Sequence, residues 1–148
     1  MRPEVSPILG KLAAHLLGEI APRLPVDYLQ KSTMLVSMML MVVAEESDRG
    51  AERRVQENRA LRRLFGESAR GIADRELRSR LEAAAEEVDE SLSLSALDRA
   101  NDALRSLLVD LHGHVEELEG SDAREVEAVI WRELRTSTER RALSMDPF

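Results

Sequence analysis

Apolar positions along the chain recur with the 3.6-residue period of α-helices, and no stretch alternates as a half-buried strand does. The pattern predicts six helices, with these approximate bounds: 7–20, 27–49, 51–65, 74–90, 96–118 and 122–136. We therefore expect an all-α fold: a single-domain helical bundle of about six helices over residues 1–148. The last dozen residues carry no periodic pattern and are expected to form a tail.

Several residues predict where these helices begin and end. Ser6 followed by Pro7 is typical of an N-cap and first helical position. Gly50 either ends the second helix or bends it into the third. Asp122 and Glu125 have the spacing of a capping box, which would start the last helix.

Residues 33–44 form an apolar run, TMLVSMMLMVVA, that contains four of the six methionines. Its 12 residues are too few to span a bilayer, which needs about 20. A helix that is apolar all round is expected to be enclosed by protein. The run thus predicts a central methionine-rich helix around which the others pack.

Leucines recur every seven residues in the fifth predicted helix, at Leu97, Leu104, Leu111 and Leu118. That spacing fits a coiled-coil seam between two chains. However, Leu108 and Val115 widen the apolar stripe to about 100°, the width expected of a helix docked on a globular core. Core packing is the favoured interpretation.

Composition excludes several classes of function. The 148 residues include no cysteine, which excludes disulfides, thiolate metal sites and cysteine nucleophiles. The N-terminus MRPEVSPILG lacks the features of a signal peptide, so we expect a cytoplasmic protein that does not enter a membrane. No catalytic motif or phosphate-binding loop is present, so an enzyme is the less favoured class and no cofactor is expected.

The net charge is −7, and the charged residues are unevenly distributed along the chain. Residues 49–80 contain ten arginines and five acids, whereas residues 82–127 contain fourteen acids and three arginines. Interleaved acids and a negative total disfavour binding to nucleic acid. We expect the two blocks to attract each other, within the fold or across a symmetric dimer.

The histidines do not predict a metal site. His15 and His112 each lie one turn before a glutamate, but no set of three or more ligands is visible. The Glu-x-x-His units of di-iron bundles are missing from the sequence as well. We therefore predict no bound metal.

Polar residues intrude on an apolar helix face just after the methionine run. Glu57 and Asn58 share a sector with Leu61 and Phe65, and Glu46 lies upstream. A buried carboxylate needs a partner, for which Arg54 and Arg62 are the candidates. One interpretation is a structural ion-pair network. The other is a ligand pocket lined by Met38, with Glu46, Glu57 and Asn58 at its polar end.

Three segments, HLLGEIAPRL, YLQKSTMLVSMMLMVVAEE and RVQENRALRRLFG, resemble a small helical bacterial family of unknown function. Its members are encoded beside acyl-CoA dehydrogenases and phosphotransferase-fold proteins. Glu19, Pro22 and Gly66 carry the resemblance, which covers the first 70 residues, while the methionine-rich helix departs from the family's Ala- and Val-rich pattern. The resemblance implies an accessory role in acyl-CoA or small-acid metabolism and supplies no catalytic residues.

Two functions remain open. The first is a non-catalytic interaction protein, a homodimer acting as accessory subunit of a metabolic enzyme, suggested by a surplus of apolar helix face. Trp131, beside Arg132 and Arg135, is a candidate interface residue because Trp and Arg are enriched there. The second is a small-molecule binder or minor enzyme that uses the pocket described above.

Overall fold

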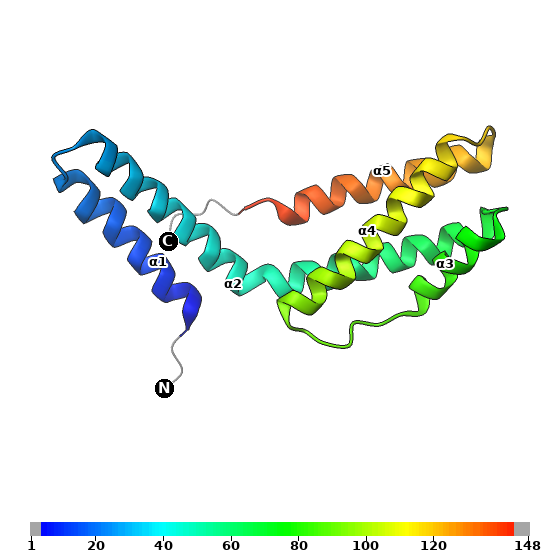
Figure 1. Ribbon diagram of the computed structural model, residues 1–148, viewed down its shortest axis with the longest axis horizontal. Helices are drawn as coiled ribbons and strands as arrows, with labels where there is room; N and C mark the ends of the chain where they lie inside the picture. Colours follow the sequence, from blue (N-terminus) through cyan, green and yellow to red (C-terminus); the bar gives the residue numbers. More distant parts are fainter. Residues whose placement is uncertain (1–3, 144–148) are drawn as a thin grey trace. The chain divides into compact units, whose positions relative to one another are not determined.

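The computed structural model describes residues 4–143, and every regular element in this range is a helix (Figure 1). The α-helices are α1 (Val5–His15), α2 (Asp27–Ser68), α3 (Arg75–Glu86), α4 (Leu94–Glu116) and α5 (Ser121–Arg141). Short turns η1 (Leu16–Ile20), η2 (Ala21–Arg23) and η3 (Ala69–Gly71) complete the set. The predicted all-α class is confirmed.

Within residues 4–143 the α-helices number five rather than six, because residues 27–49 and 51–65 belong to one 42-residue helix. Gly50 does not interrupt it. A glycine within a helix costs only about 1 kcal/mol relative to alanine, which a long helix tolerates. At this glycine a Cβ atom would lie 2.8 Å from the Glu46 side chain, so the absent Cβ leaves room for that carboxylate.

Contacts divide the chain into two compact units, residues 1–50 with 143–148, and residues 51–142. The first unit contains α1 and the first part of α2, and we call it the hairpin. The second contains the remainder of α2 with α3, α4 and α5, and we call it the bundle. Each is described by itself.

The hairpin reverses direction at a distorted helical segment. α1 begins after Glu4 rather than at a Ser6 cap, and Ser6 and Pro7 lie inside its first turn. The helix continues as one π-helical turn and then as a 3₁₀ turn that contains Pro22. Because proline has no N–H and its ring displaces the carbonyl of the preceding turn, the regular α-helix cannot pass Pro22 unchanged.

Small side chains fill the interior of the hairpin. Gly10 and Ala13 of α1 are buried, as are Ser37 and Ala44 of α2. The first residues of α1 line a pocket with Ser47 and Asp48 of α2, which indicates that the two helices run antiparallel. Small residues allow two helix backbones to approach closely.

Large apolar side chains lie on the outside of the hairpin, contrary to the expectation of an enclosed central helix. Met38 is 55% exposed and Met39 is 60% exposed. Within the hairpin, α1 packs only against the side of α2 that carries the small residues. The other sides of this part of α2 therefore remain exposed. The exposed set, which we call the hairpin surface, consists of Val5, Ile8, Leu12, Leu17, Ile20, Val26, Tyr28, Leu29, Met34, Leu35, Val36, Met38, Met39, Val42 and Val43.

The bundle has a conventional interior. Phe65 of α2, Leu81 of α3, Leu111 of α4 and Ile130 of α5 are fully buried and belong to one apolar cluster. α4 packs along α5 and also contacts α3 (Figure 1). The leucine stripe of α4 therefore faces this cluster, which confirms core packing for the part between Leu104 and Val115.

Helix ends in the bundle differ partly from the predicted ones. α3 ends at Glu86 and leaves Val88 exposed, although the predicted helix included it. The capping box predicted from Asp122 and Glu125 is wrong: Gly120, with φ of 138°, occupies the N-cap position without a side-chain cap. α5 also extends beyond its predicted end, because its last turns join the polar contacts described below.

Ion pairs join the basic block of residues 49–80 to the acidic block of residues 82–127 within the bundle. Arg54 Nε lies 2.5 Å from Asp98 Oδ1, and Arg62 Nη2 lies 2.8 Å from Asp89 Oδ1. Arg80 Nη2 lies 2.5 Å from Asp110 Oδ2. For these pairs, the expected attraction between the blocks operates inside one chain.

Candidate functional site

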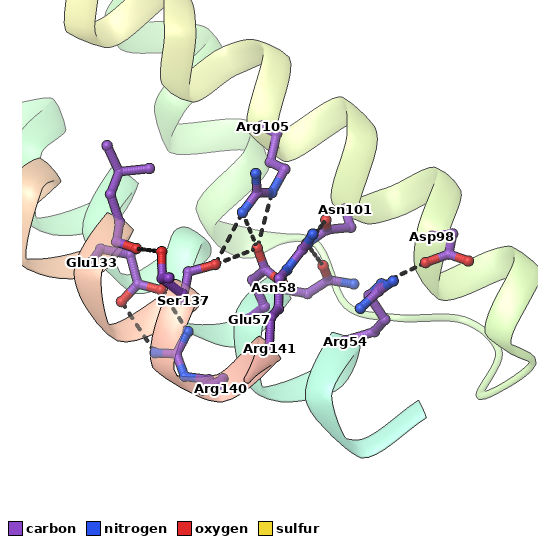
Figure 2. Close-up of polar contacts among 12 residues, drawn as sticks. Arg54, Glu57, Asn58, Asp98, Asn101, Arg105, Glu133, Ser137, Arg140 and Arg141 are labelled. Atoms are coloured by element: carbon purple, nitrogen blue, oxygen red, sulfur yellow. Dashed lines mark hydrogen bonds and ion pairs between the residues drawn. The ribbon is translucent and has the colours of Figure 1, made fainter. Parts of the chain in front are cut away.

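Glu57 lies at the centre of a buried polar network that joins three helices of the bundle (Figure 2). Its Oε1 accepts hydrogen bonds from Arg105 Nε and Nη2 at 2.9 and 2.6 Å, and from Ser137 Oγ at 2.9 Å. Its Oε2 accepts from Arg141 Nε and Nη2 at 3.0 and 2.7 Å. Each arginine therefore donates through two nitrogens to a single carboxylate oxygen, and hydrogen bonds between charged groups are roughly twice as strong as neutral ones.

A chain of amides extends the network toward the loop between α3 and α4. Arg141 Nη2 donates to Asn101 Oδ1 at 3.1 Å, and Asn101 Nδ2 donates to Asn58 Oδ1 at 2.9 Å. Asn58 Nδ2 then donates to Asp89 Oδ1 and to the Leu97 carbonyl. The contacts thus run from α5 through α4 to Asn58 of α2 (Figure 2), and from Asn58 to Asp89 in the loop.

Electrostatics keep the carboxylates of this network charged. Burial by itself raises the pKa of Glu57, but hydrogen bonds from Arg141, Arg105 and Ser137 together bring that pKa below its ordinary value. The hydrogen bond from Arg62 is the main cause that lowers the pKa of Asp89. Both groups are therefore ionised at neutral pH and paired with arginine.

The network has the chemistry of a structural clamp. Both oxygens of Glu57 have strong donors, and the carboxylate is only 3% exposed. A general base needs a free lone pair that faces a substrate, which this arrangement does not offer. Fully satisfied buried networks instead fix the relative positions of helices.

The structure brings two of the four predicted ligand-binding residues together. Glu57 and Asn58 are buried neighbours in the network, whereas Met38 and Glu46 belong to the hairpin. None of the four lines any of three pockets in the described part of the chain. The pocket expected from these residues stays a prediction.

The arginines that pair with Glu57 were not the expected ones. Arg54 pairs with Asp98 and Arg62 with Asp89, while Glu57 binds Arg105 and Arg141. The local helix pattern could not reveal this, because the partners lie 48 and 84 residues further along the chain.

A signal for the missed residues is nevertheless present in the sequence. Asn101 and Arg105 are one turn apart within the leucine stripe of α4, and Ser137 and Arg141 are one turn apart on α5. Polar residues spaced by one turn on a core-facing stripe need partners on another helix. The pattern predicts such a network without specifying which carboxylate closes it.

Histidine and tryptophan meet at a second place in the bundle. His112 packs its ring edge-to-face with Trp131, with ring centroids 5.4 Å apart. Trp131 is 52% exposed, and its Nε1 donates to Glu127 at 3.4 Å. The interface role of Trp131 stays a prediction.

Residues 4–143 lack two features that would indicate a class of function. No group of three or more His, Asp or Glu side chains in this range is placed to hold a metal ion. No helix in the same range is long and apolar enough to cross a membrane.

Comparison with known proteins gives no relative. The chain matches no protein-family model, and no curated protein or solved structure shows significant similarity to it.

Proposed function

We propose that this protein is a non-catalytic interaction protein that associates with a second copy of itself through the hairpin surface. The observation that carries the proposal is the inverted packing of the hairpin. Its large apolar side chains face outward while its small ones face inward. Exposed apolar patches of this size mark interaction sites on soluble proteins.

The area of the hairpin surface is close to that of a stable interface. Fully burying a Val, Leu or Met side chain contributes about 1.5–3 kcal/mol at 25 cal/mol per Å², which corresponds to roughly 60–120 Å² each. Side chains that are half exposed retain roughly half of that, so the fifteen together present about 450–900 Å². A standard interface buries about 800 Å² per partner.

A second copy is the occupant that fits best. Residues 32–44 contain no charged side chain, so little on this part of the surface would select a partner of opposite charge. Methionine, valine and leucine can pack against their own kind, and methionine adapts to irregular gaps. Two antiparallel hairpins pack as a four-helix bundle, and two-fold assembly is the commonest form of homo-oligomer.

The proposal gives the methionine run the environment that its composition predicts. In a pair of hairpins, the side of α2 that carries Leu35, Met39 and Val43 would be covered by the partner copy. The Gly- and Ala-lined interior would hold each hairpin together. The resemblance of the first 70 residues adds a setting: a cytoplasmic accessory subunit of an enzyme of acyl-CoA or small-acid metabolism.

Sedimentation equilibrium at micromolar concentration tests the proposal. The wild-type chain is expected at about twice its 16.6 kDa mass. Val43→Asp places a charge on the hairpin surface and is expected to give a folded monomer. Val109→Asp is the matched control, because Val109 is an exposed valine on a bundle helix, and it should remain dimeric.

Two results would overturn the proposal. One is a wild-type mass near 16.6 kDa that does not change with concentration, which would mean that no second copy covers the surface. The other is equal dissociation of the Val43→Asp and Val109→Asp variants. In that case the dimer would not depend on the hairpin.

A further inference from the structure

A cleft of about 720 Å³ lies on the bundle. Its walls come from α2, from the end of α3 with the following loop, and from Arg140 near the end of α5. Small-molecule sites occupy about 300–1,000 Å³. The cleft therefore has room for an organic ligand.

Arginine dominates the polar part of the cleft. Arg59, Arg62, Arg63 and Arg140 line it together with only two acids, Glu87 and Asp89. Asp89 is already paired with Arg62, and Glu133 holds Arg140 from outside the cleft. With Glu133 counted, four positive charges face three negative ones, which leaves a local excess of one positive charge that attracts anions.

Two of these arginines are available for a ligand. Arg59 and Arg63 lie one turn apart on α2 and are exposed. Within residues 4–143, no ion pair is formed by either of them. Guanidinium groups spaced by one helical turn can both reach a single phosphate or carboxylate.

Arg62 provides a second and independent observation. Its side chain is only 9% exposed, and although Nη2 binds Asp89, its Nε–H has no acceptor in the described part of the chain. An unsatisfied buried donor costs about 1–3 kcal/mol. An oxyanion in the cleft would supply the missing acceptor after a small shift of the guanidinium.

The other wall of the cleft is apolar. Val88 is 78% exposed and Leu92 is 71% exposed, and both belong to the loop between α3 and α4. Val55 and Ala85 add to the same lining. Apolar side chains beside unpaired arginines fit a ligand with an anionic head and a hydrocarbon part.

We propose that this cleft binds an amphipathic oxyanion, a phosphate or carboxylate attached to an apolar chain. Arg59 and Arg63 bind the head group, with Arg62 as the buried third donor. Val88 and Leu92 contact the chain. The site lies in the bundle alone, so it holds whether or not the hairpins associate.

Isothermal titration calorimetry with four probes tests this site in the full-length protein. The probes are octanoate, octyl phosphate, inorganic phosphate and the neutral detergent octyl glucoside below its micelle concentration. The two amphipathic anions are expected to bind at least tenfold more tightly than inorganic phosphate, and octyl glucoside is expected not to bind. A tenfold change corresponds to about 1.4 kcal/mol.

Variants separate the two parts of the site. The double change Arg59→Gln and Arg63→Gln should weaken both amphipathic anions at least tenfold, whereas Arg99→Gln, at an exposed arginine of α4, should not. Leu92→Ser should weaken octanoate but leave inorganic phosphate unchanged. In nuclear magnetic resonance spectra, the Arg62 Nε–H signal should shift when octanoate is added.

The proposal is overturned if neither amphipathic anion binds at millimolar concentration. It is also overturned if the double variant binds as the wild type does while its melting temperature is unchanged. Octyl glucoside binding as tightly as octanoate would show an apolar patch without anion selectivity and would equally end the proposal.

Discussion

The hairpin and the bundle distribute large and small side chains in opposite ways. In the bundle, Phe65, Leu81 and Leu111 are buried, and the exposed surface is mostly charged. In the hairpin, Ala13 and Ala44 are buried while Met38 and Met39 face outward. The bundle therefore buries its large apolar side chains within its own helices. The hairpin is also rich in apolar residues, but its two helices are too few to bury its large side chains.

The difference shows how many neighbouring helices are needed to bury an apolar helix. α4 is covered by neighbours from both α3 and α5, so Leu97, Leu104 and Leu111 are buried, whereas Leu118, beyond the end of the helix, is 42% exposed. The first part of α2 is as apolar but has a single helix beside it in its unit. One neighbour covers only one side of a helix that is apolar all round. The remaining sides require a partner, which is the basis of the proposed dimer.

The largest expected effect comes from removing a bundle core side chain. Phe65→Ala should lower the free energy of unfolding by about 3–5 kcal/mol, because it leaves a cavity at a fully buried site. Met39→Ala, at a side chain that is 60% exposed, should change it by less than about 0.5 kcal/mol. Urea denaturation followed by far-UV circular dichroism, which reports the helices of both units, measures both.

Equal losses in the free energy of unfolding for Phe65→Ala and Met39→Ala would contradict the difference in packing between the bundle and the hairpin. They would mean that the methionine run is enclosed in the folded single chain, as its composition alone suggests. A Met39→Ala effect that appears only in the concentration dependence of unfolding would instead support burial between two copies.

The second-largest loss in the free energy of unfolding is expected when the polar network around Glu57 is broken. Glu57→Ala should cost about 2–3 kcal/mol, below the 3–5 kcal/mol typical of a broken buried pair, because Arg105 and Arg141 are partly exposed and water can reach them. Glu86→Ala, at an exposed position of α3, is the control and should have little effect. A neutral Glu57→Ala would show that the network does not hold the helices of the bundle.

The fold class was predictable from the sequence, and the environment of each helix only in part. The period of the apolar positions predicted helices throughout, and the stripe on α4 was correctly assigned to the core. The same reasoning wrongly enclosed Met38, since periodicity reports how apolar a face is and not what covers it. Gly50 shows a similar limit, because a helix-weakening residue need not end a long helix.

The polar site was predictable as a cluster but not as a set of pairs. Glu57 and Asn58 stood out because they interrupt an apolar face, and both are buried. Their partners on α4 and α5 are set by the tertiary packing of distant segments, which local spacing cannot specify. The same limit explains why Arg54 and Arg62 were the wrong candidates for Glu57.

Acid should weaken the bundle through its lowered carboxyl pKa values. Glu57 and Asp89 have pKa values below ordinary in the folded chain, so the unfolded chain binds protons first as pH falls. Their contribution is complete above the ordinary pKa of about 4 and is lost as pH falls through the lower folded values. The urea midpoint between pH 7 and pH 3 measures this effect.

The Glu57→Gln variant provides the control for that measurement. Its midpoint should be lower at pH 7 but should fall less steeply toward pH 3, because one of the titrating groups is gone. Parallel profiles for the variant and the wild type would show that Glu57 does not have a lowered pKa in the folded state.

The smallest effect is expected inside the hairpin, where the side chains are smallest. Ala13 is fully buried, and Ala14, the next residue, is exposed. Ala13→Leu should cost about 1 kcal/mol, at the low end for overpacking, because a shift of α1 away from α2 can admit the larger side chain. Ala14→Leu should be nearly neutral, since both residues favour helices.

Hydrogen exchange measures this effect locally: amides of α1 should lose protection in Ala13→Leu alone, while those of α4 stay unchanged. Equal exchange in the two variants would mean that the buried small residues do not form the contact that holds the hairpin together. The dimer proposal would then lose one of its two supports, the packing of small side chains inside the hairpin.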